Sequence, residues 1–275
     1  MKAAAFIYHA APTLAATCAA LADRTDNAKV MGGGQSLGPM LNLRLTRPDA
    51  VYDLSKLAEL RTVSVEQDRV RIGAAVTHAQ IEDGEFPALR GTMLQSMAHG
   101  IAYRAIRNRG TIGGSLAHAD PAADWVVALT AVGAELELAS KGGTRRVPMT
   151  QFMLGAYTTA LTEGEVIAAV HVPRHNDDVR WGYHKLCRKT GEFAEASCAA
   201  YFDPSARFAR IVLGALDGAP AVLHGLASGI AAHGPAALTP QAVLAAVTQA
   251  TPGKDAIDRK LYCTAATRCI EQLFN

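Results

Sequence analysis

The sequence lacks the features that mark several large classes of protein. The 275-residue chain has no run of about 18 apolar residues, the length that a membrane-spanning helix needs. Its 27 basic and 25 acidic residues are spread along the chain. They form no basic block, which is the pattern typical of proteins that bind nucleic acid or a membrane surface. We therefore expect no membrane span and no nucleic-acid partner.

Cysteine is scarce, and its five copies are scattered. They form no C-x-x-C pair and no group with histidine at zinc spacing, and they offer no ligand run for an iron–sulfur cluster. An odd, scattered set fits a reducing compartment better than a disulfide framework. His171 and His175 are close in sequence, but Pro173 between them favours an extended segment over a metal-binding helix. We expect a cytoplasmic protein with no metal site in this chain.

The order of hydrophobic patterns predicts two regions. The alanine-rich N-terminus could pass for a signal peptide, but Tyr8, His9 and Pro12 interrupt it, so we expect a strand over Ala4–Tyr8 and a helix over Thr13–Ala22. Further strands are expected at Ala28–Met31 and Ala50–Leu54, hairpins at 62–75 and 134–148, helices at 77–83, 88–98 and 120–132, and a strand at 165–173.

A polar stretch at 174–180 is the best boundary in the chain. Beyond it we expect three strands, at 181–188, 196–202 and 209–216, and a C-terminal helix that buries Ile257, Leu261, Ala265, Cys269 and Leu273. The predicted organisation is a first domain over 1–176, with subdomains of about 1–55 and 56–176, and a second domain over 177–275.

Two glycine-rich segments carry the chemistry. In KVMGGGQSLGPMLNLRL, Gly32, Gly33 and Gly34 follow a short strand. Glycine lets backbone N–H groups approach phosphate oxygens and permits positive φ, although a tight structural turn is the alternative explanation for any single run of glycines. The Walker motif is excluded, because no lysine ends the loop. The dinucleotide fingerprint G-x-G-x-x-G fits poorly, because Leu37 stands at its third glycine.

Asp53 follows the loop by about 20 residues, where a ribose-binding acid of that fingerprint would stand. Pro39 and Pro48, however, leave room for only a short helix between the loop and Asp53. The second segment, RNRGTIGGSLAHADPAAD, again combines two glycines with a hydroxyl, and Asp124 follows it. Asp124 can accept from a ribose hydroxyl or can serve only as an acid near a helix N-terminus.

Taken together, the two segments resemble those of a known family. GGGQSLGPMLNLRLTRP and RNRGTIGGSLAHADPAAD are similar, in this order, to the two motifs of the FAD-binding medium subunit of the molybdenum hydroxylases. That family includes the carbon monoxide dehydrogenase medium subunit and the FAD domain of xanthine dehydrogenase. The resemblance implies an α+β fold in which two FAD-binding subdomains, of the PCMH and CO dehydrogenase flavoprotein type, precede a three-stranded antiparallel sheet with helices. Asp53 becomes a bystander.

The resemblance also implies an FAD site at matching positions. The diphosphate would be held by a first loop, Val30, Met31, Gly32, Gly33, Gly34, Gln35, Ser36 and Leu37, and a second loop, Thr111, Ile112, Gly113, Gly114 and Ser115. Asp124 would hold a ribose hydroxyl, Ile167 and Ile101 would line the flavin pocket, and Lys185 would approach the isoalloxazine edge. Valine at Gly33 or Gly114 should abolish FAD retention with the fold intact.

The function implied is that of an oxidoreductase subunit with no catalytic acid, base or nucleophile of its own. A large molybdopterin subunit and a small subunit with two [2Fe-2S] clusters would be its partners, in a dimer of heterotrimers. Its FAD would pass electrons to an external acceptor, because redox chemistry belongs to the cofactor. A hydrolase of the G-x-S-x-G type has no support in the sequence. A non-catalytic assembly or binding protein that keeps the fold without flavin remains the alternative.

Overall fold

The computed structural model describes residues 2–24 and 26–275. Its N-terminal part is a small parallel sheet of three strands, β1 (Ile7–Ala10), β3 (Ala50–Asp53) and β2 (Ala28–Met31), in that order. Helix α1 (Leu14–Ala22) joins β1 to β2 and begins where the Thr13 hydroxyl accepts from the Ala16 amide. Helix α2 (Leu37–Asn42) follows the first glycine loop.

The second sheet is antiparallel, with strands β4 (Val63–Val65), β5 (Arg69–Gly73), β10 (Val166–Pro173), β6 (Glu135–Ser140) and β7 (Gly143–Pro148) in that spatial order. The middle strand β10 is buried from Val166 to Val172. This burial explains its nearly continuous apolar sequence, because both of its faces are covered by protein. The expected hairpins at 62–75 and 134–148 are confirmed, the second with its first strand beginning at Glu135.

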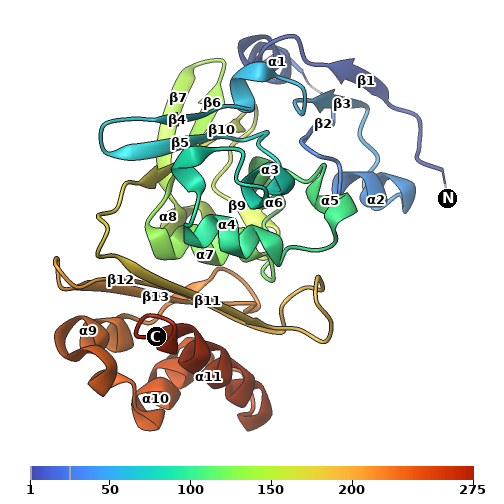
Figure 1. The fold of residues 1–275 in the computed structure, drawn as a ribbon. Coiled ribbons are helices and arrows are strands. Elements are labelled where there is room, and N and C mark those ends of the chain that lie inside the picture. The colour runs from blue at the N-terminus through green and yellow to red at the C-terminus, as the bar shows by residue number, and fades with distance from the viewer. Residues whose placement is uncertain (1, 25) are drawn as a thin grey trace.

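Helices cover one face of the second sheet (Figure 1). They are short and connected by loops, and a two-stranded hairpin follows the last of them. The elements are α3 (His78–Glu82), α4 (Met93–His99), α5 (Arg104–Arg107), α6 (Ile112–His118), α7 (Asp124–Val132), α8 (Met149–Phe152), β8 (Met153–Gly155) and β9 (Thr158–Thr159). Short 3-10 turns lie at Ala58–Leu60 and Pro87–Leu89.

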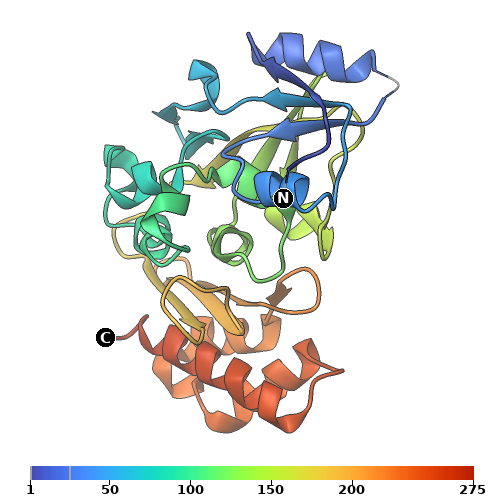
Figure 2. The same cartoon turned by 90° about the vertical axis from the view of Figure 1, so that its right-hand side faces the viewer.

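The C-terminal part is an antiparallel sheet backed by three helices, drawn at the bottom of Figures 1 and 2. Its strands are β11 (Arg180–Leu186), β12 (Ala196–Asp203), β13 (Phe208–Gly214) and the two-residue β14 (Ala221–Val222). The helices are α9 (His224–His233), α10 (Pro240–Ala250) and α11 (Ala256–Glu271). The three long strands are those expected, and β14 extends their sheet.

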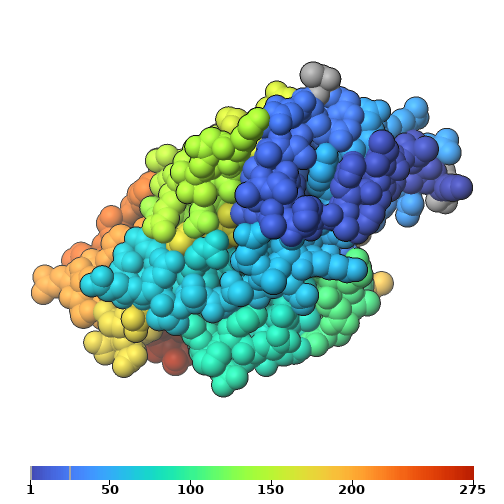
Figure 3. Space-filling model, turned by 90° about the horizontal axis from the view of Figure 1, so that it is seen from above, coloured from blue at the N-terminus to red at the C-terminus, as the bar shows by residue number. Residues whose placement is uncertain are grey.

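The largest apolar core lies around α7, which is buried along its whole length. Trp125 at its start is fully buried, and Ala199 of β12 and Val212 of β13 belong to the same core. A second core fills the space between the C-terminal sheet and α9 to α11. A third joins Cys18 of α1 to the second sheet, and Figure 3 shows the N-terminal segment beside that sheet.

Several predicted boundaries are wrong. The first strand begins at Ile7 rather than Ala4. Asp120 caps a turn through the Ala122 amide, so the next helix begins only at Asp124. The helix expected from Ala88 begins at Met93, because Gly91 has a φ of +71°. In the C-terminal helix, Ile257 is 75% exposed and Leu261 is only partly buried, whereas Cys269 is buried as predicted. Within the described part of the chain, no helix combines the length and apolar character needed to cross a bilayer.

Candidate functional site

A cavity of about 860 Å³ lies where the three parts of the fold meet. This volume is within the range of pockets that enclose cofactors and other ligands of similar size. Its walls come from the first glycine loop, the second glycine loop with the start of α7, strand β10, and the segment after β11. A ligand in the cavity would therefore contact residues that are far apart in sequence.

The two glycine loops contact each other at the bottom of this cavity. A Cβ atom added at Gly33 would lie 1.8 Å from the Arg109 carbonyl oxygen, and one added at Gly32 would lie 2.6 Å from the Thr111 hydroxyl. Gly34 has a φ of +74°, which disfavours other residues. Contact between the loops therefore requires glycine at Gly32 and Gly33 even before any ligand is considered.

This contact changes the expectation for valine at Gly33. A side chain there would strike the backbone of the second loop rather than a ligand alone, so the fold around the loops would also be disturbed. At Gly114 the nearest obstacle is the Thr111 hydroxyl, at 2.8 Å. The prediction that the Gly33 variant leaves the fold intact is wrong for this physical reason.

The second loop is fixed by the segment that follows β5. The Ile112 amide donates to the Val76 carbonyl at 3.0 Å, and the Gly113 amide donates to the Ala74 carbonyl at 2.9 Å. The Thr111 hydroxyl accepts from the Gly114 amide at 3.1 Å and so caps α6. Ile112 points into the core and is fully buried, so its side chain does not line the cavity.

Asp124, the first residue of α7, connects the cavity to the C-terminal sheet. Its side chain is largely buried, and its Oδ1 atom accepts from the Tyr183 hydroxyl at 2.5 Å and lies 2.9 Å from the Lys185 Nζ. Lys185 also donates to the Gly100 carbonyl at 2.8 Å. Burial of the Tyr183 hydroxyl and the charge of Asp124 raise the pKa of Tyr183 well above its ordinary value. Tyr183 therefore stays a neutral donor to the carboxylate.

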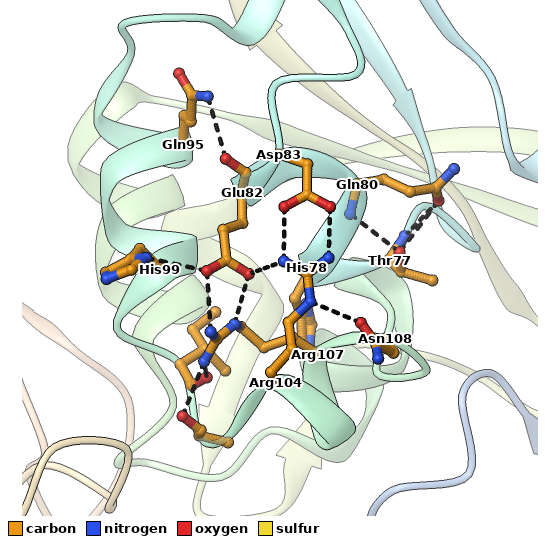
Figure 4. A network of polar contacts seen from close by, with 12 residues as sticks. Thr77, His78, Gln80, Glu82, Asp83, Gln95, His99, Arg104, Arg107 and Asn108 are labelled. Carbon is orange, nitrogen blue, oxygen red and sulfur yellow. Dashed lines mark hydrogen bonds and ion pairs between the residues drawn. The ribbon is translucent and has the colours of Figure 1, made fainter.

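An ion-pair network fixes the wall formed by Ile101 and Ala102 (Figure 4). Arg107 donates to both carboxylate oxygens of Glu82, at 2.7 and 2.9 Å, and its third nitrogen donates to the carbonyls of Ile101 and Ala102, at 2.8 and 3.0 Å. Burial raises the pKa of Glu82, but the hydrogen bonds and charge of Arg107, with the His99 hydrogen bond and the charge of Arg104, together exceed that effect and lower it. Ala102 has a φ of +43°, so the hydrogen bond from Arg107 to its carbonyl holds a strained residue in place.

The loop after β11 closes the cavity from the C-terminal side. Gly191 has a φ of +89°, and a Cβ there would lie 2.6 Å from the Ala102 carbonyl oxygen. Phe193 follows shortly after it, lines the cavity and is 66% exposed. Tyr103 also lines the cavity and is likewise exposed, and these two side chains are taken to mark the cavity mouth. The sequence Thr190-Gly191 between the predicted strands 181–188 and 196–202 indicates only a turn, and no local pattern connects that turn to the glycine loops.

The structure brings most of the expected residues to one place. All of the expected site residues line the cavity except Ile112, which is in the core, and Lys185, which reaches it through Asp124. Asp53 does not line it, because its carboxylate accepts from the Tyr8 hydroxyl and the Ser55 amide. His78 and His118 do line it; sequence analysis gave no role to His78. Among the described residues, no three His, Cys, Asp or Glu side chains form a group that could hold a metal ion.

Comparison with known proteins agrees with this geometry. Residues 3–175 match the family model described as the FAD binding domain in molybdopterin dehydrogenase. The carbon monoxide dehydrogenase medium chain of Hydrogenophaga pseudoflava is 38% identical over 194 residues, which are 70% of this chain and 68% of that protein. Caffeine dehydrogenase subunit beta of Pseudomonas sp. (strain CBB1) is 32% identical over 230 residues, which are 82% of this chain and 78% of that protein.

Solved structures show the same fold over the whole chain. The match to carbon monoxide dehydrogenase from Hydrogenophaga pseudoflava has a TM-score of 0.90 and 31% identity, and it covers 100% of this chain and 99% of that one. The match to quinoline 2-oxidoreductase from Pseudomonas putida 86 has a TM-score of 0.88 and 31% identity, covering 99% and 98%. The chain therefore belongs to the FAD-binding family of the molybdopterin dehydrogenases and is an oxidoreductase subunit of the molybdenum hydroxylase type.

Proposed function

We propose that this chain is the electron-transfer subunit of a heterotrimeric molybdenum hydroxylase. Electrons would come from [2Fe-2S] clusters in a small partner subunit, after a large molybdopterin subunit has oxidised the substrate, and would leave to an external acceptor. The relatives named medium chain and subunit beta support this division of work. Bound FAD would supply the chemistry, since a flavin can take up single electrons from the clusters in two steps and pass them on singly or as a pair.

The observation that carries the proposal is the cavity built from both glycine loops. We propose that Val30 to Leu37 and Thr111 to Ser115 hold the FAD diphosphate, the first loop in part through the backbone N–H groups of its glycines. In the second loop the amides of Gly113 and Gly114 already donate within the protein, so this loop would contribute through close approach of its backbone and through the Ser115 hydroxyl. Ile112 would support this cradle only indirectly, by anchoring the loop, because its side chain is in the core and its amide donates to the Val76 carbonyl.

We propose that Asp124 accepts from a ribose hydroxyl through Oδ2, because both of its donors within the protein contact Oδ1. Lys185, held between Asp124 and the Gly100 carbonyl, would place a positive charge near the isoalloxazine edge. Ile101 and Ile167 would provide apolar walls for the ring. Water exclusion would depend on Phe193 and Tyr103 at the mouth.

Purification of the native assembly tests the function. We expect the chain to purify with two other subunits, to release FAD on denaturation, and to show flavin reduction only after the iron–sulfur clusters have been reduced by substrate. The proposal would be contradicted if the chain purified alone and carried out the complete substrate-driven reaction. It would also be contradicted if the flavin were reduced before the clusters. A colourless protein with no affinity for FAD would instead favour a binding or assembly protein.

A further inference from the structure

His78 lies beneath the second glycine loop, at the start of α3. Its amide donates to the Gly110 carbonyl at 2.9 Å, and the residue before it, Thr77, forms an isolated β-bridge with Thr111. The side chain is only 5% exposed and lines the cavity. His78 is thus fixed by backbone contacts to the loop that forms the cavity floor.

Trp125 determines which nitrogen of His78 carries the proton. The Trp125 indole Nε1, which can only donate, lies 3.1 Å from the His78 Nδ1 inside the protein. Nδ1 must therefore be the acceptor, and in a neutral ring the proton is then on Nε2. Burial, with the nearby positive charge of Arg107, lowers the pKa of His78 to about 4, so the ring is neutral at pH 7.

The N–H group at Nε2 has no acceptor within the described residues. It is not among the fully buried atoms that lack a partner, so it is accessible from the cavity. The edge of the ring that carries Nε2 faces Gly110, where an added Cβ would lie 2.8 Å from this nitrogen. Gly110 in turn faces Gly33, whose added Cβ would lie 2.8 Å from the Gly110 Cα. The unpaired donor is therefore close to the junction of the two glycine loops. A donor that opens on the cavity and has no acceptor in the protein is free to bind a ligand oxygen there.

We propose that His78 is a further FAD-binding residue, whose Nε2–H, held in this tautomer by Trp125, donates a hydrogen bond to an acceptor atom of the dinucleotide. The inference rests on the proposed assignment of the cavity to FAD. Trp125 acts as a positioning residue, because it contacts His78 and not the cavity. His78 and Trp125 are 47 residues apart in sequence, so the pair becomes visible only in the structure.

Two substitutions by amide side chains test the roles of the two ring nitrogens of His78 one at a time. His78→Asn keeps an acceptor near the Nδ1 position for Trp125 and removes the donor at Nε2, whereas His78→Gln can place an amide donor near Nε2 and gives up the acceptor. Each full-length protein is stripped of flavin, checked for native circular dichroism, and titrated with FAD while flavin fluorescence is followed. We expect His78→Asn to bind FAD at least tenfold more weakly than the wild type and His78→Gln to stay within about threefold, because one charge-assisted or buried hydrogen bond has this order of effect.

A second measurement uses the wild-type chain. In ¹⁵N-histidine-labelled protein, the His78 Nε2–H signal should be present without FAD and should shift when FAD is added, whether or not either variant folds. Equal FAD affinity of wild type and His78→Asn, or an Nε2–H signal unchanged by FAD, would overturn the role of His78 alone. Failure of the wild-type chain and its native assembly to bind FAD would overturn the assigned cavity and this inference together.

Discussion

Gly33 and Arg109 lie so close that an added Cβ on the glycine would be 1.8 Å from the arginine carbonyl oxygen. Gly33→Ala must therefore separate the two loops, and we expect it to lower the free energy of unfolding by about 1–3 kcal/mol and to weaken FAD retention. Gly38→Ala is the matched control, because a Cβ there meets nothing within 4 Å and helix α2 favours alanine. Urea unfolding and FAD content after gel filtration would check this. Equal stability of the two variants would contradict the loop contact.

The network in Figure 4 contains a buried ion pair, Glu82–Arg107, and an exposed ion pair, Asp83–Arg104, and Arg104 also contacts Glu82. Glu82 and Arg107 are each about 10% exposed, whereas Asp83 is 41% exposed. We expect Glu82→Gln to cost about 3 kcal/mol, since it leaves the Arg107 charge buried without its partner. Asp83→Asn should cost less than about 1 kcal/mol. Denaturant titrations of both variants, at the same ionic strength, would measure the difference; a larger effect at Asp83 would show that Arg107 does not hold the wall.

The hydrogen bond from Tyr183 to Asp124 connects β11 to α7. Tyr183→Phe should lower the free energy of unfolding by about 1.5–3 kcal/mol, as expected for a lost bond to a charged acceptor, and should speed the loss of FAD. Tyr157→Phe serves as control, because that hydroxyl is 3.4 Å from Asp120 on an exposed side chain. Stopped-flow release of FAD and thermal unfolding would test the pair. If both variants behave alike, the contact has no role in joining the C-terminal sheet to α7.

Protonation of His78 should make stability depend on pH. Its pKa is about 4 in the folded chain and 6.5 when unfolded, so the unfolded chain binds the extra proton first as pH falls from 6.5 towards 4. The wild type should lose about 1.4 kcal/mol per pH unit from this group in that window, and about 3 kcal/mol over all of it. Urea titrations at pH 7, 5.5 and 4.5 would compare the wild type with His78→Asn. A constant difference between the two across these pH values would exclude a neutral buried His78.

Truncation tests the boundary proposed near residue 176. The fragment 1–176 lacks Ala199 and Val212 of the largest core and Phe193 of the cavity wall. We expect it to lose cooperative unfolding and FAD binding, even though it contains the whole matched segment, 3–175. Addition of the separate 177–275 chain should restore part of both. A stable fragment that binds FAD as tightly as the full chain would show that the C-terminal part is dispensable for the site.

The sequence predicts the loops because their chemistry is local. Gly32 to Gly34 and Thr111 to Ser115 are contiguous segments, and hairpins such as β6–β7 depend on neighbouring residues. The helix start at Asp124 was misplaced because Asp120-Pro121 satisfies the same capping pattern in a turn. The pair of His78 and Trp125, and the contact of Gly191 with Ala102, depend on long-range packing. No spacing or propensity rule reports such contacts.

The last wall of the cavity has a consequence for how the protein is made. The loop through Phe193 and the side chain of Lys185 lie far after the two glycine loops in the chain. During synthesis, the ribosome therefore releases both glycine loops well before the residues that close over them. Flavin that meets the growing chain at that stage finds an open groove, so stable loading of the cofactor becomes a late step in biogenesis, after β11 has paired with β12.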